Sequence, residues 1–123
     1  MAFEEHINSA CRVLKHSFKT VPGLFTGKEI CIMDYLSQKL NDKVIEVRFD
    51  TATLTCLFDK NDICDGAFLF LDDLNDLQHY IDYCNKKYPY NFILCGWIIE
   101  DCCFQIKPCK HDYYFALLPA TSN

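Results

Sequence analysis

In two parts of the chain apolar residues recur every three or four positions, the spacing that places side chains on one face of a helix. The first part covers residues 3–18, with glutamates at its start and basic residues at its end, an order that suits the helix dipole. The second part follows Asp73 and ends with two lysines. Its apolar positions are Leu74, Leu77, Ile81, Cys84 and Tyr88. Both parts are predicted to be helices.

Another helix is predicted between these two, from Thr26 to about residue 40. A Val-Pro-Gly break precedes it, and Thr26 and Glu29 have the spacing of a capping box. Its inward positions would be Ile30, Met33, Ser37 and Leu40, and Asn41-Asp42 would end it.

From residue 43 the period of the apolar pattern changes to two, which predicts strands at 43–49 and 53–58 and a third, short strand at 67–71. Residues 91–99 are apolar on both alternating faces and predict a strand in the middle of the sheet. Two more strands are expected at 102–107 and 113–118. Residues 1–123 therefore predict one α+β domain, a mainly antiparallel sheet packed by helices in the order α-α-β-β-β-α-β-β-β.

Composition narrows the function classes. Half of the 123 residues are apolar and the net charge is −5, which argues against a protein that binds the phosphate backbone of nucleic acids. The longest uncharged apolar run, residues 92–99, is far shorter than a membrane-spanning helix. The N-terminus lacks the pattern of an export signal, so a cytoplasmic location is expected. In that compartment the nine cysteines are expected to be free thiols.

Soft metal ligands gather only near the C-terminus, at Cys95, Cys102, Cys103, Cys109 and His111. They lack the paired spacing of a zinc site, and adjacent Cys102 and Cys103 would point to opposite faces of a strand. We therefore expect small buried side chains, with no metal and no cofactor. His6, His16 and His79 have no metal spacing either and are expected on helix surfaces.

One loop holds the ingredients of a reactive thiol. Cys109, Lys110, His111 and Asp112 supply a thiol, a cation, a base and a carboxylate in succession. A thiolate beside a cation is more reactive than a core cysteine. A thiol-dependent enzyme or redox sensor that uses Cys109 and His111 is therefore one alternative function.

The charge pattern favours a different function. Seven aspartates and a single basic residue lie within residues 59–82, so this stretch contains the whole acidic excess of the chain. The aspartates are Asp59, Asp62, Asp65, Asp72, Asp73, Asp76 and Asp82. Tyr80 and Tyr83 lie in or next to the stretch and are expected off the buried face of their helix, and Tyr90 is expected in the turn that follows it. If the carboxylates gather on one rim, they would steer a basic protein while the tyrosines supply contact area.

An acidic, tyrosine-bearing segment in a small domain without a catalytic signature resembles the immunity proteins of bacterial toxin–immunity pairs. That resemblance implies a non-catalytic, cytoplasmic inhibitor whose partner is a basic protein, such as a toxin nuclease domain. The net charge and the short apolar runs predict no direct contact with nucleic acid or membrane. A structural subunit that oligomerises through its strand edges is the third alternative.

Overall fold

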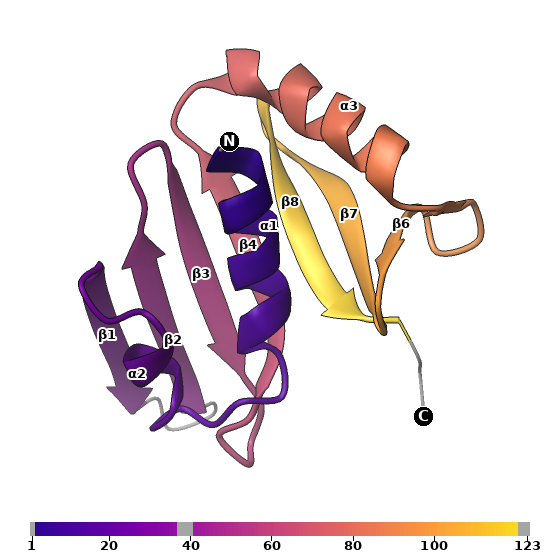
Figure 1. Ribbon diagram of the computed structural model, residues 1–123. Coiled ribbons are helices and arrows are strands. Elements are labelled where there is room, and N and C mark those ends of the chain that lie inside the picture. Colours follow the sequence, from indigo (N-terminus) through magenta and orange to yellow (C-terminus); the bar gives the residue numbers. More distant parts are fainter. Residues whose placement is uncertain (1, 37–40, 121–123) are drawn as a thin grey trace.

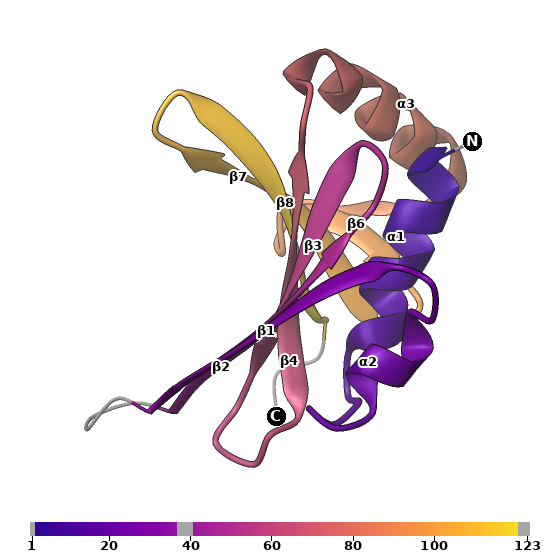
Figure 2. The same cartoon turned by 90° about the vertical axis from the view of Figure 1, so that its left-hand side faces the viewer.

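The helices of this protein lie on one face of a single antiparallel sheet (Figures 1 and 2). The computed structural model describes residues 2–36 and 41–120. Its helical elements are α1 (Ala2–Val13), α2 (Val21–Leu24), η1 (Leu74–Asp76) and α3 (Leu77–Lys87). Its strands are β1 (Glu29–Leu36), β2 (Asn41–Arg48), β3 (Ala52–Phe58), β4 (Cys64–Leu71), β5 (Tyr90–Asn91), β6 (Gly96–Ile99), β7 (Cys102–Cys109) and β8 (Asp112–Pro119).

The strands lie in the order β1-β2-β3-β4-β8-β7-β6-β5, and every neighbouring pair is antiparallel. The predicted meander over residues 43–71 is confirmed as β2, β3 and β4. The last strand of the chain, β8, returns to the middle of the sheet and pairs with β4. The α+β class and the antiparallel sheet are therefore confirmed.

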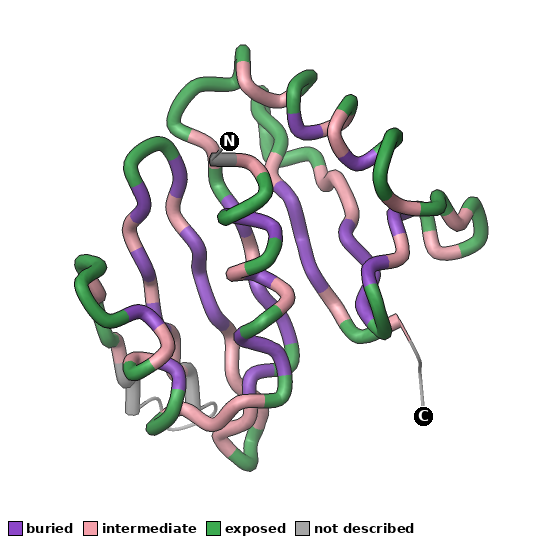
Figure 3. The backbone as a smooth tube through the Cα atoms, viewed as in Figure 1, coloured by how far each residue is buried: buried purple, intermediate pink, exposed green. Residues whose placement is uncertain are grey.

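Alternation along the strands separates two faces of the sheet. One face packs under α1 and α3, and most of its central side chains are almost fully buried, among them Ile45, Leu54, Leu69, Phe104 and Phe115 (Figure 3). The rings of Phe104 and Phe115 stack with centroids 4.6 Å apart. In Figure 2 no helix lies on the opposite face. Hydrophobic burial under the helices thus holds the fold together, while the opposite face has no second layer among the described residues.

Two sequence predictions about this sheet are wrong. The segment predicted as a helix from Thr26 is strand β1, which pairs with β2 from Glu29 to Leu36, while Ser37 and Leu40 lie outside the described residues. The Thr26 hydroxyl does not cap a helix but donates to the carbonyl oxygen of Gly23 (3.2 Å). Residues 91–99 are not a central strand: they form β5, a turn and β6 at the sheet edge.

The first helix is also shorter than predicted, since α1 ends at Val13. Lys15 has a positive φ of 72°, which ends the helical path. The backbone then runs beside the start of β4, where the Lys15 amide donates to the Cys64 carbonyl oxygen (2.8 Å). The apolar period continues to Phe18 because this irregular segment also packs on the core.

A buried hydrogen bond joins α1 to α3. His6 and Tyr80 are each 1% exposed, and His6 Nδ1 lies 2.5 Å from Tyr80 Oη. The His6 ring also packs against Phe49, with ring centroids 4.9 Å apart. Both residues were expected on helix surfaces, so both expectations are wrong. Burying a polar side chain costs free energy of folding unless it has a hydrogen-bond partner, and here His6 and Tyr80 are partners for each other.

We expect this pair to make stability depend on pH. Burial lowers the pKa of His6 below 6.5, so the folded protein resists protonating a histidine that the unfolded chain protonates readily. The contribution of His6 to the free energy of unfolding is fully present above about pH 6.5. Below that pH the contribution falls by up to about 1.4 kcal/mol per pH unit. Urea unfolding across pH 5–8 measures the effect. His6→Gln should flatten the slope, whereas His111→Gln, on the surface, should not; equal slopes in all three proteins would contradict the assignment.

Candidate partner-binding site

The seven aspartates of residues 59–82 do not share one rim, so that expectation is corrected. Asp59, Asp62 and Asp65 lie at the β3–β4 turn, and Asp72, Asp73 and Asp76 lie beyond the far end of β4. Asp65 and Asp72 are separated by seven residues of extended chain, or about 24 Å. The strand expected at 67–71 lies between these two groups, and as β4 it is long enough to hold them at opposite ends.

The aspartates at the β3–β4 turn mostly serve the local fold. Asp59 Oδ1 accepts hydrogen bonds from the amides of Asn61 (2.8 Å) and Ile63 (3.1 Å), which closes the turn. Asp62 forms an ion pair with Lys43 at 3.0 Å. Asp65 is exposed at the irregularity in the β3–β4 pairing.

At the other end of β4, Asp72 and Asp73 contact Arg48 and the start of η1. Arg48 holds Asp72 through two hydrogen bonds, and this contact keeps the pKa of Asp72 below its usual range. Asp73 accepts from the Asn75 amide at the start of η1 (2.9 Å). Asp76 follows on η1. Asp82 lies further along, on α3, where it accepts from the Gln78 side chain (3.0 Å).

The three tyrosines have three different surroundings. Tyr80 is buried, and burial raises its pKa above the usual value. Tyr83 is half-buried and accepts a hydrogen bond from Lys87 Nζ (3.0 Å). Tyr90 is 41% exposed but lies on the β5 edge. These side chains therefore do not form one surface with the aspartates.

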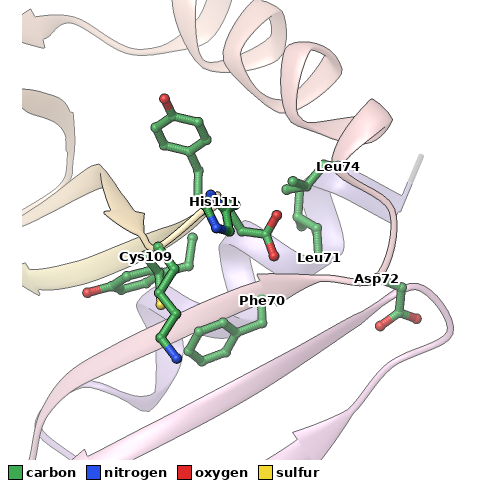
Figure 4. A pocket seen from close by; sticks show the side chains of 10 residues that line it. Phe70, Leu71, Asp72, Leu74, Cys109 and His111 are labelled. Atoms are coloured by element: carbon green, nitrogen blue, oxygen red, sulfur yellow. The ribbon is translucent and has the colours of Figure 1, made fainter.

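A pocket does lie beside Asp72, in the fork where β4 and β8 separate. The two strands pair only from Ala67–Leu117 to Leu69–Phe115. Beyond that point β4 continues to Leu71, while the β7–β8 hairpin diverges from it. The pocket between them, which we call the fork, has a volume of about 450 Å³. Figure 4 shows residues of β4 and of the hairpin around it.

Aromatic and aliphatic side chains supply most of the fork's walls. Phe70 and Tyr114 stack with ring centroids 5.3 Å apart, and Phe68 packs edge-on against Tyr114 at 5.1 Å. Phe70 is 38% exposed and Tyr113 is 49% exposed, so these rings remain available for contact. The lining residues are Phe70, Leu71, Asp72, Leu74, Cys109, Lys110, His111, Asp112, Tyr113 and Tyr114.

The charge around the fork is mainly negative. Arg48 neutralises Asp72, and within the described ranges no ion pair engages Asp73, Asp76 or Asp112. Lys110, which also lines the fork, contributes one positive charge there. Carboxylates beside exposed aromatic rings form a suitable seat for lysine or arginine, since the rings attract cations through their faces.

The same lining contains the thiol and imidazole of the alternative hypothesis. Cys109 pairs with Asp112 across the hairpin, and Lys110 and His111 form its two-residue turn. In the part of the chain that the structure describes, no hydrogen bond joins Cys109 Sγ to His111. The hairpin thus brings the Cys109 thiol and the His111 imidazole near one another, but without the hydrogen bond by which a base activates a nucleophile.

Cysteine labelling distinguishes these two hypotheses. Cys31, Cys95 and Cys109 are exposed, whereas burial raises the pKa of Cys11 and Cys84 to about 12 and that of Cys102 to about 11. We therefore expect iodoacetamide at neutral pH to label the three exposed cysteines at similar rates and the others only after unfolding. Mass spectrometry of quenched samples measures the rates. A Cys109 that reacts much faster than Cys31 would favour the thiol enzyme instead.

Sequence reasoning missed a second exposed feature, the turn between β5 and β6. Phe92 is 85% exposed and Ile93 is 92% exposed, although the pattern predicted both as core. Asn91 Oδ1 fixes the turn by accepting from the amides of Ile93 and Leu94, each at 2.9 Å. The only signal that could have indicated this was Asn91, a common turn residue, at the start of the run.

Among residues 2–36 and 41–120 no group of three or more His, Cys, Asp or Glu side chains is placed to hold a metal ion. No helix in these ranges is both long and apolar enough to cross a membrane. The chain matches no known protein family, curated protein or solved structure.

Proposed function

We propose that this chain is a non-catalytic protein-binding domain that holds a basic protein partner at the fork. The observation that carries the proposal is the combination, in one pocket of about 450 Å³, of exposed aromatic walls with two carboxylates on the lining, Asp72 and Asp112. Two further carboxylates, Asp73 and Asp76, follow on the adjoining chain. Aromatic rings that lose water on binding supply affinity, and the acidic rim speeds encounter with a cationic partner.

The proposed partner inserts lysine or arginine side chains between Asp112 and the Asp73–Asp76 segment, and it packs apolar atoms against Phe70 and Tyr114. A basic nuclease toxin, the partner that the resemblance to immunity proteins implies, would present such side chains. Binding them would block the groups that the nuclease uses to hold phosphates. The binding surface we propose is smaller than the expected rim of seven aspartates. Of those seven, the proposed surface includes Asp72, Asp73 and Asp76.

Charge reversal at the fork tests this function. Asp72 and Asp73 are unsuitable because they hold Arg48 and the η1 turn, so Asp76 and Asp112 are changed instead. Purified wild type, Asp76→Lys/Asp112→Lys and Asp65→Lys/Asp82→Lys serve as bait in extracts of the native host. The second variant has the same change in net charge elsewhere on the molecule.

We expect wild type and the Asp65→Lys/Asp82→Lys control to retain the same basic protein, and the fork variant to retain at least tenfold less. This difference follows because reversing two charges near bound cations replaces attraction by repulsion. Equal retention by all three baits would contradict a partner at the fork.

A further inference from the structure

The backbone of β4 presents hydrogen-bonding groups to the fork. The Asp72 amide donates to the Thr51 carbonyl oxygen (3.0 Å), on the β3 side of β4. Because the backbone groups of successive residues in an antiparallel ladder point to alternate sides, the N–H and C=O of Leu71 point away from β3, toward β8. The pairing of β4 with β8 stops at Leu69, so among the described residues Leu71 faces no partner strand there.

The backbone of β8 presents the same groups from the other wall. Leu69 has the same orientation as Leu71, so it exchanges hydrogen bonds with its β8 partner Phe115. Tyr113 lies two positions before Phe115, and its N–H and C=O therefore point to the same side, into the fork. The proline at position 108 agrees with this register. Pro108, which has no N–H, pairs with Tyr113 across the hairpin, at a position that exchanges no hydrogen bond with β8.

One extended segment can pair with both walls at once. If it runs antiparallel to β4, its middle residue exchanges two hydrogen bonds with Leu71, and the residues on either side of it bond to Tyr113 in the parallel pattern. In the reverse direction the two walls exchange roles. The segment separates β4 from β8 by two strand spacings, about 10 Å, at a level where the hairpin already diverges (Figure 2). The fork's volume of about 450 Å³ lies in the usual range of ligand sites.

Side chains on the two walls predict which residues the segment carries. Leu71 lies on the helix face of the sheet, where it packs against the core, and Tyr113 lies on the same face by alternation with Phe115. Asp72 and Asp112 come next along the chain and lie on the opposite face. A middle residue between Leu71 and Tyr113 is therefore apolar, and its neighbour between the two carboxylates is lysine or arginine.

The stacked rings of Phe70 and Tyr114 receive the third residue of the segment. They lie at the narrow end of the fork, with centroids 5.3 Å apart, on the same face as the two carboxylates. The aliphatic stem of a lysine or arginine packs on such rings while their faces attract its cation. The walls of the fork therefore match an extended segment in which an apolar residue lies between two basic ones.

We propose that the basic partner binds by strand insertion, with an extended basic–apolar–basic segment that pairs with β4 on one side and β8 on the other. The inference rests on the proposed function and adds how the partner is held. Main-chain hydrogen bonds to Leu71 and Tyr113 supply affinity, and the alternating side chains supply specificity. The segment closes the gap in the sheet, so that β4 and β8 each have a neighbouring strand along the fork.

Two synthetic peptides test the insertion by nuclear magnetic resonance on the isotopically labelled full chain. The first is acetyl-Thr-Lys-Leu-Lys-Thr-amide, and the second differs only by a methyl group on the leucine nitrogen. That methyl group removes the N–H that pairs with one wall, while the side chains and the charge stay the same. Near saturation we expect the first peptide to slow hydrogen exchange of the Leu71 and Tyr113 amides by about tenfold. The methylated peptide should bind about tenfold more weakly, the effect of one main-chain hydrogen bond.

Three other results overturn the insertion and differ in what they mean for the proposed function. Equal affinity of the two peptides, with unchanged exchange at Leu71 and Tyr113, would leave the fork as a site for cationic side chains without a strand. Slowed exchange along β1, the long edge strand, in place of the fork would assign the peptide to the sheet edge. If neither peptide binds at millimolar concentration, the fork does not hold basic segments, and the proposed function fails together with the insertion.

Discussion

Phe115→Ala is expected to lower the free energy of unfolding by about 3–5 kcal/mol, the usual cost of removing a buried phenylalanine side chain. Phe115 is 0% exposed and stacks on Phe104, and its ring centroid lies 5.4 Å from that of Tyr80. It also forms the last β4–β8 pair, with Leu69, before the two strands diverge. Its ring therefore anchors the point from which the fork opens.

Urea unfolding at pH 7.5 measures this effect, with Tyr113→Ala as the control on the same strand. Tyr113 is 49% exposed, so its truncation should change the free energy of unfolding by no more than about 0.5 kcal/mol. A loss below about 1 kcal/mol for Phe115→Ala would mean that this ring is not packed as described.

Phe70→Ala and Tyr114→Ala are each expected to weaken binding of the partner by about thirtyfold, which corresponds to about 2 kcal/mol. The two rings stack on one wall of the fork, and aromatic side chains that become fully desolvated in a complex contribute most of the affinity. The measurement is the dissociation constant of the partner retained by wild-type bait, determined by calorimetry.

Phe92→Ala is the matched control for these two variants. Phe92 is also an exposed aromatic residue, but it lies on the β5–β6 turn rather than in the fork. Its loss should leave the dissociation constant unchanged. The reverse result, with weakened binding for Phe92→Ala alone, would move the contact surface to that turn.

Local periodicity predicted the central strands and α3 because their apolar residues follow the covered face of one sheet. It failed for β1, where Ile30 and Met33 have helical spacing although Ile30 pairs with Val47 and Met33 with Val44. A three-residue spacing places them on opposite faces of a strand, and pairing with β2 decided between the two structures.

The failures at the candidate site have a different cause. The sequence distance between Asp65 and Asp72 is short, but an extended strand between them separates their carboxylates by the length of β4. Tyr80 lies off the apolar stripe of its helix, and no local pattern shows its hydrogen bond to His6, 74 positions earlier in the chain. The fork itself arises from the early divergence of β4 and β8, a long-range feature that no local pattern contains.

Site-specific photocrosslinking tests the partner at the fork most directly. Benzoylphenylalanine replaces Tyr113 in one protein and Asp65 in another, both at exposed positions, and the cells that naturally make the chain are irradiated. The account predicts a covalent adduct with one basic protein from position 113 and none with that protein from position 65. No adduct from position 113, or the same adduct from both positions, would contradict it.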